Sequence, residues 1–179
     1  MYFITLGLSA KTFSVTVLSS VLKPIGLKII LKIALIFAVI QILLAILGWF
    51  SGLLFSAWLE QYSSSLAYSI LTIVGIKMVI STFKLKSRLR IVDSGNNIEL
   101  LILSVATGID IFIAAIALGL IDIPLSRLIL LLGIIIFLVS VAGASFGKKY
   151  PMKYGNLVEF IGGLIIIFIG MRYLIELMN

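Results

Sequence analysis

The sequence of 179 residues contains no cysteine and no histidine. Without cysteine the chain can form neither disulfide bonds nor thiolate metal sites. Without histidine it lacks imidazole metal ligands and the side chain that most often carries protons near neutral pH. We therefore expect any metal site in this protein to consist of oxygen ligands.

Charged residues are also scarce, at 12% of the sequence, whereas hydrophobic residues make up 62%. A soluble domain cannot bury so much apolar surface, but several helices in a bilayer can. A helix needs about 20 residues to cross a hydrocarbon core of about 30 Å, so six spans use nearly the whole chain. Apolar runs such as 29–49 and 157–177 are helical in length, not the short alternating segments of a barrel. The sequence predicts an all-α integral membrane protein with six transmembrane helices.

The first apolar run is interpreted as a retained helix, because it contains Lys11 and continues without a clear cleavage site into Lys23 and Pro24. Proline is poorly tolerated inside a helix, so the first span should end there. The expected spans cover residues 2–22, 29–50, 66–83, 98–120, 128–146 and 156–178. Within this single transmembrane domain, residues 84–97 are predicted to be a cytoplasmic linker between a first repeat, 1–83, and a second, 98–179.

The net charge of +7 could indicate nucleic-acid binding, but the basic residues gather in short connections after the first, third and fifth spans. They are Lys23, Lys28, Lys32, Lys84, Lys86, Arg88, Arg90, Lys148, Lys149 and Lys153. The other connections hold Glu60, Asp122 and a single Arg127. Because cytoplasmic loops carry an excess of Lys and Arg, we expect these three connections in the cytoplasm and both chain ends outside. The lipid bilayer, and no nucleic acid, is the expected partner.

Matched positions relate the two halves. They are Gly48 with Gly143, Gly52 with Gly147, and Gly75-Ile76-Lys77-Met78 with Gly170-Met171-Arg172-Tyr173. Setting Phe13 against Phe112 also brings Lys11 opposite Asp110. Three spans per half would make the halves opposite in orientation. This is an inverted repeat, an arrangement that places transport sites near the bilayer midplane.

Asp110 lies in the middle of the apolar segment 104–120. A carboxylate there costs roughly 2.5–3.5 kcal/mol on insertion scales, so it should face the bundle interior and have a partner. We interpret Asp110 as a cation ligand or proton carrier, with a purely structural charge as the alternative. Lys11 is the candidate partner, since opposite charges about 4 Å apart attract by about 4 kcal/mol at an effective dielectric of 20. Alternatively, the long stem of Lys11 carries its charge toward an interface.

Four uncharged or acidic side chains are further candidates for the same site. Glu159, near the cytoplasmic end of the sixth span, is either a second carboxylate at the cation entrance or a helix N-terminal acid favoured by the macrodipole. Gln41 is either an oxygen donor or a hydrogen-bonding group between helices. Thr107 and Ser140 are weaker candidates, because hydroxyl groups often serve helix packing alone.

The remaining polar features indicate no chemistry of their own. Lys77 and Arg172, near the ends of the third and sixth spans, are interpreted as snorkelling anchors. The sequence contains no phosphate-binding loop, no nucleophile with a base and no Glu-x-x-His motif. We therefore expect neither an enzyme nor a bound cofactor, and any transport would draw on an ion gradient or the membrane potential.

Motifs along nearly the whole chain resemble one known family. They are Phe37-Ala38-Val39-Ile40-Gln41, Leu47-Gly48-Trp49, Gly75-Ile76-Lys77-Met78, Ala106-Thr107-Gly108-Ile109-Asp110, Gly133-Ile134 with Phe137, Ser140 and Gly143, and Glu159-Phe160-Ile161-Gly162-Gly163-Leu164. In these motifs the chain is similar to the MntP-like manganese efflux pumps of the LysE-type exporter superfamily. The resemblance implies a bacterial cytoplasmic membrane protein that exports Mn²⁺ and in which Asp110, the aspartate of the fourth span, is central to export. Our first hypothesis takes Asp110 as the main metal ligand, with Glu159 and Gln41 in support. Mn²⁺ is a hard ion that suits oxygen ligands.

One motif departs from the family pattern. Gly7-Leu8-Ser9-Ala10-Lys11-Thr12-Phe13 stands where the family has Gly-Leu-Ser-Met-Asp-Ala-Phe, so a lysine replaces an aspartate. One hypothesis is a secondary transporter that exports a divalent cation, with Mn²⁺ as the expected substrate, by alternating access. Another is a divergent non-transporting membrane protein, structural, accessory or sporulation-related, with an internal Lys11–Asp110 ion pair. A third keeps transport but changes the substrate, or has Lys11 release its proton during the cycle.

Overall fold

The computed structural model describes residues 2–21, 26–56, 58–59, 62–83, 97–147 and 153–178, which form six helices. They are α1 (Tyr2–Val21), α2 (Leu27–Ser56), α3 (Ser63–Phe83), α4 (Asn97–Leu120), α5 (Leu125–Phe146) and α6 (Lys153–Met178). All six are long and apolar enough to cross a membrane, which confirms the expected all-helical membrane fold. The predicted linker 84–97 lies outside the described residues, apart from Asn97, where α4 begins.

The second span is longer than predicted. We expected it to end near Phe50, in the Gly48 to Gly52 segment, but α2 continues to Ser56. The two glycines are packing positions inside the helix, not a terminus. A Cβ atom at Gly48 would collide with the carbonyl oxygen of Phe112, and one at Gly52 with that of Ile116. Glycine is therefore required here because α2 and α4 approach each other at backbone distance.

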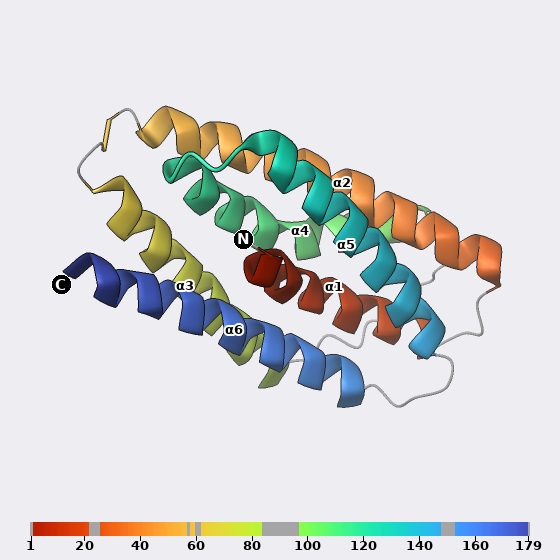
Figure 1. The fold of residues 1–179 in the computed structure, drawn as a ribbon. Helices are drawn as coiled ribbons and strands as arrows, with labels where there is room; N and C mark the ends of the chain where they lie inside the picture. Colours follow the sequence, from red (N-terminus) through yellow and green to blue (C-terminus); the bar gives the residue numbers. More distant parts are fainter. Residues whose placement is uncertain are drawn as a thin grey trace.

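Each pair of packed helices has a counterpart in which every helix is replaced by the matching helix of the other half (Figure 1). α1 packs against α5 and α6, and α4 packs correspondingly against α2 and α3. The pairs α2 with α5 and α3 with α6 are their own counterparts. α1 and α4 are the most buried of the six spans, so the residues that they carry on their inner faces lie in the middle of the bundle.

Individual contacts repeat in the same way. Gly143 of α5 meets the carbonyl oxygen of Phe13, as Gly48 of α2 meets that of Phe112. The two contacts involve Phe13 and Phe112, which are matched in the same alignment of the halves that sets Lys11 against Asp110. They favour the predicted relation between the halves and determine the position of α1 along α5 and of α4 along α2.

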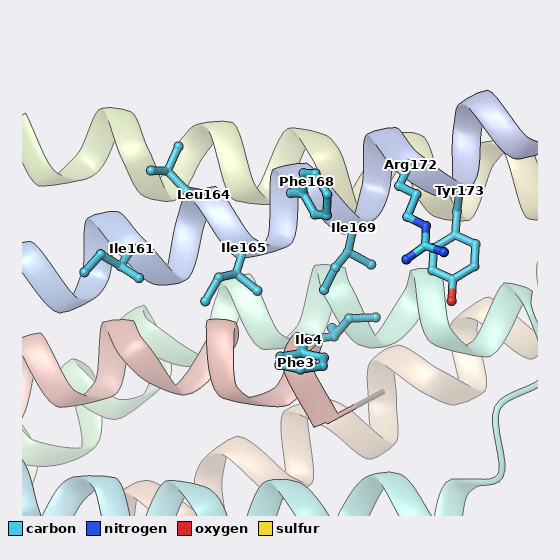
Figure 2. Close-up of a pocket in the computed structure, with 9 residues that line it drawn as sticks. All are labelled: Phe3, Ile4, Ile161, Leu164, Ile165, Phe168, Ile169, Arg172 and Tyr173. Atoms are coloured by element: carbon cyan, nitrogen blue, oxygen red, sulfur yellow. The ribbon is translucent and has the colours of Figure 1, made fainter.

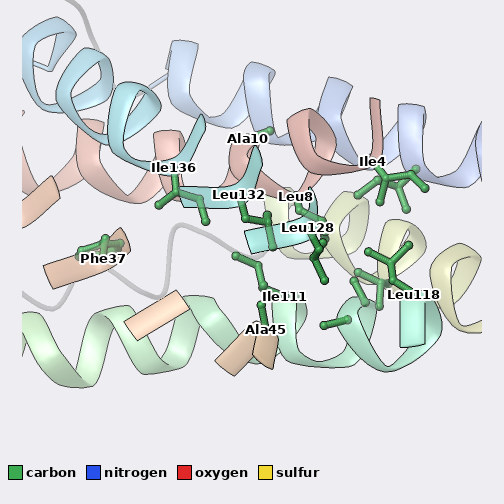
Figure 3. Packing of buried hydrophobic residues seen from close by; sticks show 14 of the residues in the cluster. Ile4, Leu8, Ala10, Phe37, Ala45, Ile111, Leu118, Leu128, Leu132 and Ile136 are labelled. Carbon is green, nitrogen blue, oxygen red and sulfur yellow. The ribbon is translucent and has the colours of Figure 1, made fainter. Parts of the chain in front are cut away.

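The centre of the bundle contains tightly packed apolar side chains (Figure 3). Leu8 of α1, Ala45 of α2, Ile111 of α4 and Leu132 of α5 are all at most 2% exposed. Large apolar side chains also cover the outer faces, where a soluble protein would carry polar ones; Leu138 of α5, for example, is 60% exposed. Such outer faces suit contact with lipid chains.

Candidate functional site

Asp110 is the centre of a buried charge cluster on the inner face of α4. Its side chain is 3% exposed, and each of its carboxylate oxygens accepts a hydrogen bond from an ammonium group. Lys11 of α1 donates to Oδ2, and Lys77 of α3 donates to Oδ1. A carboxylate without partners would be costly at this depth, and the two lysines satisfy it on both sides.

The two lysines differ in their access to the surroundings. The Lys11 side chain is 7% exposed, so its ammonium group is enclosed by the bundle. The Lys77 side chain is 50% exposed, so it reaches the carboxylate from the edge of the bundle. The Lys77 side chain therefore has space at the edge of the bundle to turn away from Asp110, whereas the Lys11 side chain is confined.

The interpretation of Lys77 as a snorkelling anchor was wrong. Its ammonium group turns inward to Asp110 and not toward an interface. The sequence held one signal that could have revealed this role: Lys77 lies inside an otherwise apolar span, two residues after Gly75, a small residue typical of close helix packing. A lysine so near a close-packed position of an apolar helix needs an acidic partner, and few carboxylates lie within the spans.

Gln41 joins three helices beside the charge cluster. Its side-chain oxygen accepts a hydrogen bond from the Thr12 hydroxyl of α1 at 3.1 Å, and its amide nitrogen donates to the Thr107 hydroxyl of α4 at 3.2 Å. Gln41 is fully buried. Because Thr12 follows Lys11 and Thr107 lies one turn before Asp110, these hydrogen bonds hold α1, α2 and α4 together at the depth of the ion pair.

Glu159 of α6 is buried but does not contact Asp110. One of its carboxylate oxygens accepts a hydrogen bond from the Ser81 hydroxyl of α3 at 2.6 Å, and the other has no hydrogen-bond partner among the described residues. Ser81 lies one turn after Lys77 on α3. The two carboxylates predicted as metal ligands are therefore both linked to α3, one through Lys77 and one through Ser81.

Ser140 is also buried, on α5, and its hydroxyl group has no hydrogen-bond partner in the described part of the chain. The structure thus brings Lys11, Gln41, Thr107 and Asp110 to one depth and leaves Ser140 without a polar contact. Within the described residues, no three acidic side chains gather as a ready-made metal centre.

The charges determine what this cluster can bind. With all four groups ionised, Asp110 and Glu159 balance Lys11 and Lys77, so the closed site has no net charge with which to attract a further cation. If Lys77 withdraws, Asp110 and Glu159 outweigh Lys11 by one negative charge. A site of that net charge attracts cations and repels anions.

The fold and the buried charge cluster define a multi-pass membrane protein with an ionisable site inside its helix bundle. Comparison with known proteins identifies the family: residues 24–174 match the family described as "Putative manganese efflux pump", and the chain belongs to it.

Similar proteins described as "Putative manganese efflux pump MntP" occur in several organisms. The protein of Methanosarcina barkeri is 33% identical over 176 residues, which cover 98% of this chain and 94% of the relative. That of Methanothermobacter thermautotrophicus is 32% identical, covering 98% and 95%. That of Crocosphaera subtropica is 33% identical, covering 96% and 92%. No solved structure matches the chain significantly.

Proposed function

We propose that this protein is a secondary transporter that exports a divalent metal cation, with Mn²⁺ as the expected substrate, across the cytoplasmic membrane. The observation that carries the proposal is the buried carboxylate of Asp110, whose oxygens are both occupied by ammonium groups of the chain itself. Family membership supplies the class of substrate. Oxygen ligands are the ones that Mn²⁺ prefers, and neither cysteine nor histidine is available.

In this proposal Lys77 occupies the cation site when no substrate is bound. An incoming cation competes with the Lys77 ammonium group for Asp110, and the half-exposed lysine withdraws. Ser81 lies on the same helix, so movement of α3 alters the contacts of both Asp110 and Glu159. Asp110 acts as the main ligand, Glu159 as a second carboxylate, and Gln41 with Thr107 as the neutral part of the site. Ser140 is an additional candidate ligand from α5.

A difference between the halves supports alternating access. Gly7 of α1 packs against the backbone of Gly162 in α6, and Ala10 is 6% exposed. Ile109, the residue of α4 that matches Ala10, is 46% exposed. The contact of α1 with α6 is therefore closed where the matching face of α4 is open. If α1 adopted the open arrangement and α4 the closed one, the site in the inverted halves would open to the opposite side of the membrane.

Transport by purified protein in proteoliposomes tests the proposal. The native chain should carry Mn²⁺ down a gradient. Transport should be lost in Asp110→Asn, because this change removes the carboxylate of the main ligand and leaves Lys11 and Lys77 without their counter-charge. Asp122→Asn is the matched control, since Asp122 is exposed in the turn between α4 and α5. Equal transport by the native chain and Asp110→Asn would refute the assigned site.

The enclosed Lys11 favours a second candidate, a non-transporting membrane protein in which the Lys11–Asp110 ion pair is permanent. The Lys11 ammonium group has no exposed route away from Asp110. In that case the native chain would not transport Mn²⁺, and Lys11→Asp would create transport by restoring a second carboxylate. Transport by the native chain excludes this candidate.

A further inference from the structure

A groove of about 620 Å³ lies between α6 and the first turn of α1. Five apolar residues of α6 line it together with Phe3 and Ile4 of α1: Ile161, Leu164, Ile165, Phe168 and Ile169. Arg172 and Tyr173 lie at one end of this row, and Ile161 lies at the other (Figure 2). The groove thus has an apolar body and a cationic end.

Its length matches one leaflet of a bilayer. The twelve residues from Ile161 to Arg172 extend about 16 Å along the helix, roughly half of a hydrocarbon core of about 30 Å. The twenty residues from Lys153, where α6 begins, to Arg172 extend about 28 Å, close to the whole core. Arg172 and Tyr173 lie in the last two turns of α6, from which their long side chains can reach the headgroup region, where tyrosine is also enriched.

Arg172 differs from its counterpart Lys77 in having no acidic partner on another helix; Glu176 lies one turn further along α6 and forms no ion pair with it. Lys77, at the matching position of α3, pairs with Asp110 of α4. The residue of α1 that matches Asp110 is Lys11, a cation, so Arg172 finds no carboxylate there. Arg172 is exposed and makes no ion pair with any described residue. Its guanidinium group has the fork of donors that binds phosphate oxygens in pairs.

We propose that this groove binds an anionic phospholipid, with one acyl chain along the apolar row and the headgroup phosphate on Arg172. The charge selects an anionic headgroup, and the length of the groove selects a lipid over a free anion. The site does not depend on whether the protein transports a cation, because none of its residues contacts Asp110 or Glu159.

Thermal unfolding of the purified, delipidated full-length chain tests the site. Phosphatidylglycerol should raise the melting temperature at concentrations several-fold lower than phosphatidylcholine with the same acyl chains. Arg172→Gln should raise the half-saturating concentration of phosphatidylglycerol about fivefold, the expected effect of one basic residue at an anionic surface. Arg127→Gln, which removes an exposed arginine in the first turn of α5, should leave it unchanged.

Further measurements test for other occupants of the groove. Leu164→Trp should weaken phosphatidylglycerol binding by narrowing the groove, whereas inorganic phosphate should leave the melting temperature unchanged. Equal responses to the two lipids, an unaltered response in Arg172→Gln, or a full response to phosphate alone would each overturn the proposal. So would a lipid-free dimer that Leu164→Trp dissociates, since a second copy would then fill the groove.

Discussion

At the scale of single residues, Asp110 serves as the counter-charge for two lysines of different character. Lys11 is enclosed and Lys77 is half-exposed, so removal of the carboxylate affects them unequally. The Lys77 side chain lies at the edge of the bundle and has space to turn away, whereas the Lys11 ammonium group would stay enclosed without a partner. The stability of the bundle should therefore depend mainly on the Lys11–Asp110 pair.

Asp110→Asn should destabilise the protein by about 3–5 kcal/mol, the usual cost of removing one member of a buried ion pair. Adding Lys11→Met should recover most of this loss, because the unpaired charge is then gone and a side chain of similar length fills its place. Thermal unfolding in one detergent measures both effects, with Asp122→Asn as the control. Failure of Lys11→Met to rescue Asp110→Asn would show that Lys11 is not held by that carboxylate.

Lys77 governs the affinity of the proposed site, because its ammonium group competes with the substrate. Lys77→Gln should lower the Mn²⁺ concentration for half-maximal transport by about tenfold or more, as expected for the loss of one competing charge at an effective dielectric near 20. Transport assays in proteoliposomes measure this concentration. Lys32→Gln removes an exposed lysine of α2 and should have no effect. A reduced affinity in Lys77→Gln would mean that Lys77 helps to hold the substrate.

Sequence alone gave a partial account of these residues. Alignment of Phe13 with Phe112 set Lys11 opposite Asp110, and the structure shows the two in contact. The partner role of Lys77 was missed because sequence position does not reveal which way a long, flexible side chain turns. The link between Glu159 and Ser81 depends on the packing of α3 with α6, which no local pattern encodes. The roles of Asp110 and Glu159 as metal ligands stay predictions.

At the scale of helices, small residues decide how closely the spans approach. Apolar run length predicted all six helices, because a bilayer fixes the number of residues needed to cross it. The ends were less predictable: α2 continues beyond Gly52, since glycine in a membrane helix serves packing as often as termination. Which glycine contacts which backbone becomes visible only once the helices are placed.

Two glycines with different surroundings test this role. Gly52→Ala should destabilise the protein by about 1–3 kcal/mol, because the added methyl group meets the Ile116 carbonyl oxygen and α2 must move away from α4. Gly133→Ala is the matched control in α5, where the methyl group meets only the flexible end of the Ile42 side chain. It should be neutral or stabilising by up to about 1 kcal/mol. Unfolding of both variants gives the comparison, and equal losses would contradict close packing at Gly52.

At the scale of the whole molecule, the proposed transport cycle requires the two halves to lie in opposite senses across the membrane. Six spans and the basic connections after α1, α3 and α5 predict this orientation, with both ends outside. The matched contacts of Gly48 and Gly143 favour equivalent packing surfaces in the two halves.

The absence of native cysteine makes the orientation directly measurable, since a single introduced thiol gives the only labelling signal. Lys28→Cys, in the first turn of α2, should be labelled by a membrane-impermeant maleimide only after the cells are opened, because we place that end of α2 in the cytoplasm. Asp122→Cys, in the turn between α4 and α5, should be labelled in intact cells. The reverse pattern would place both chain ends in the cytoplasm and would contradict the proposed orientation. The open face of α4 would then lie toward the opposite side of the membrane.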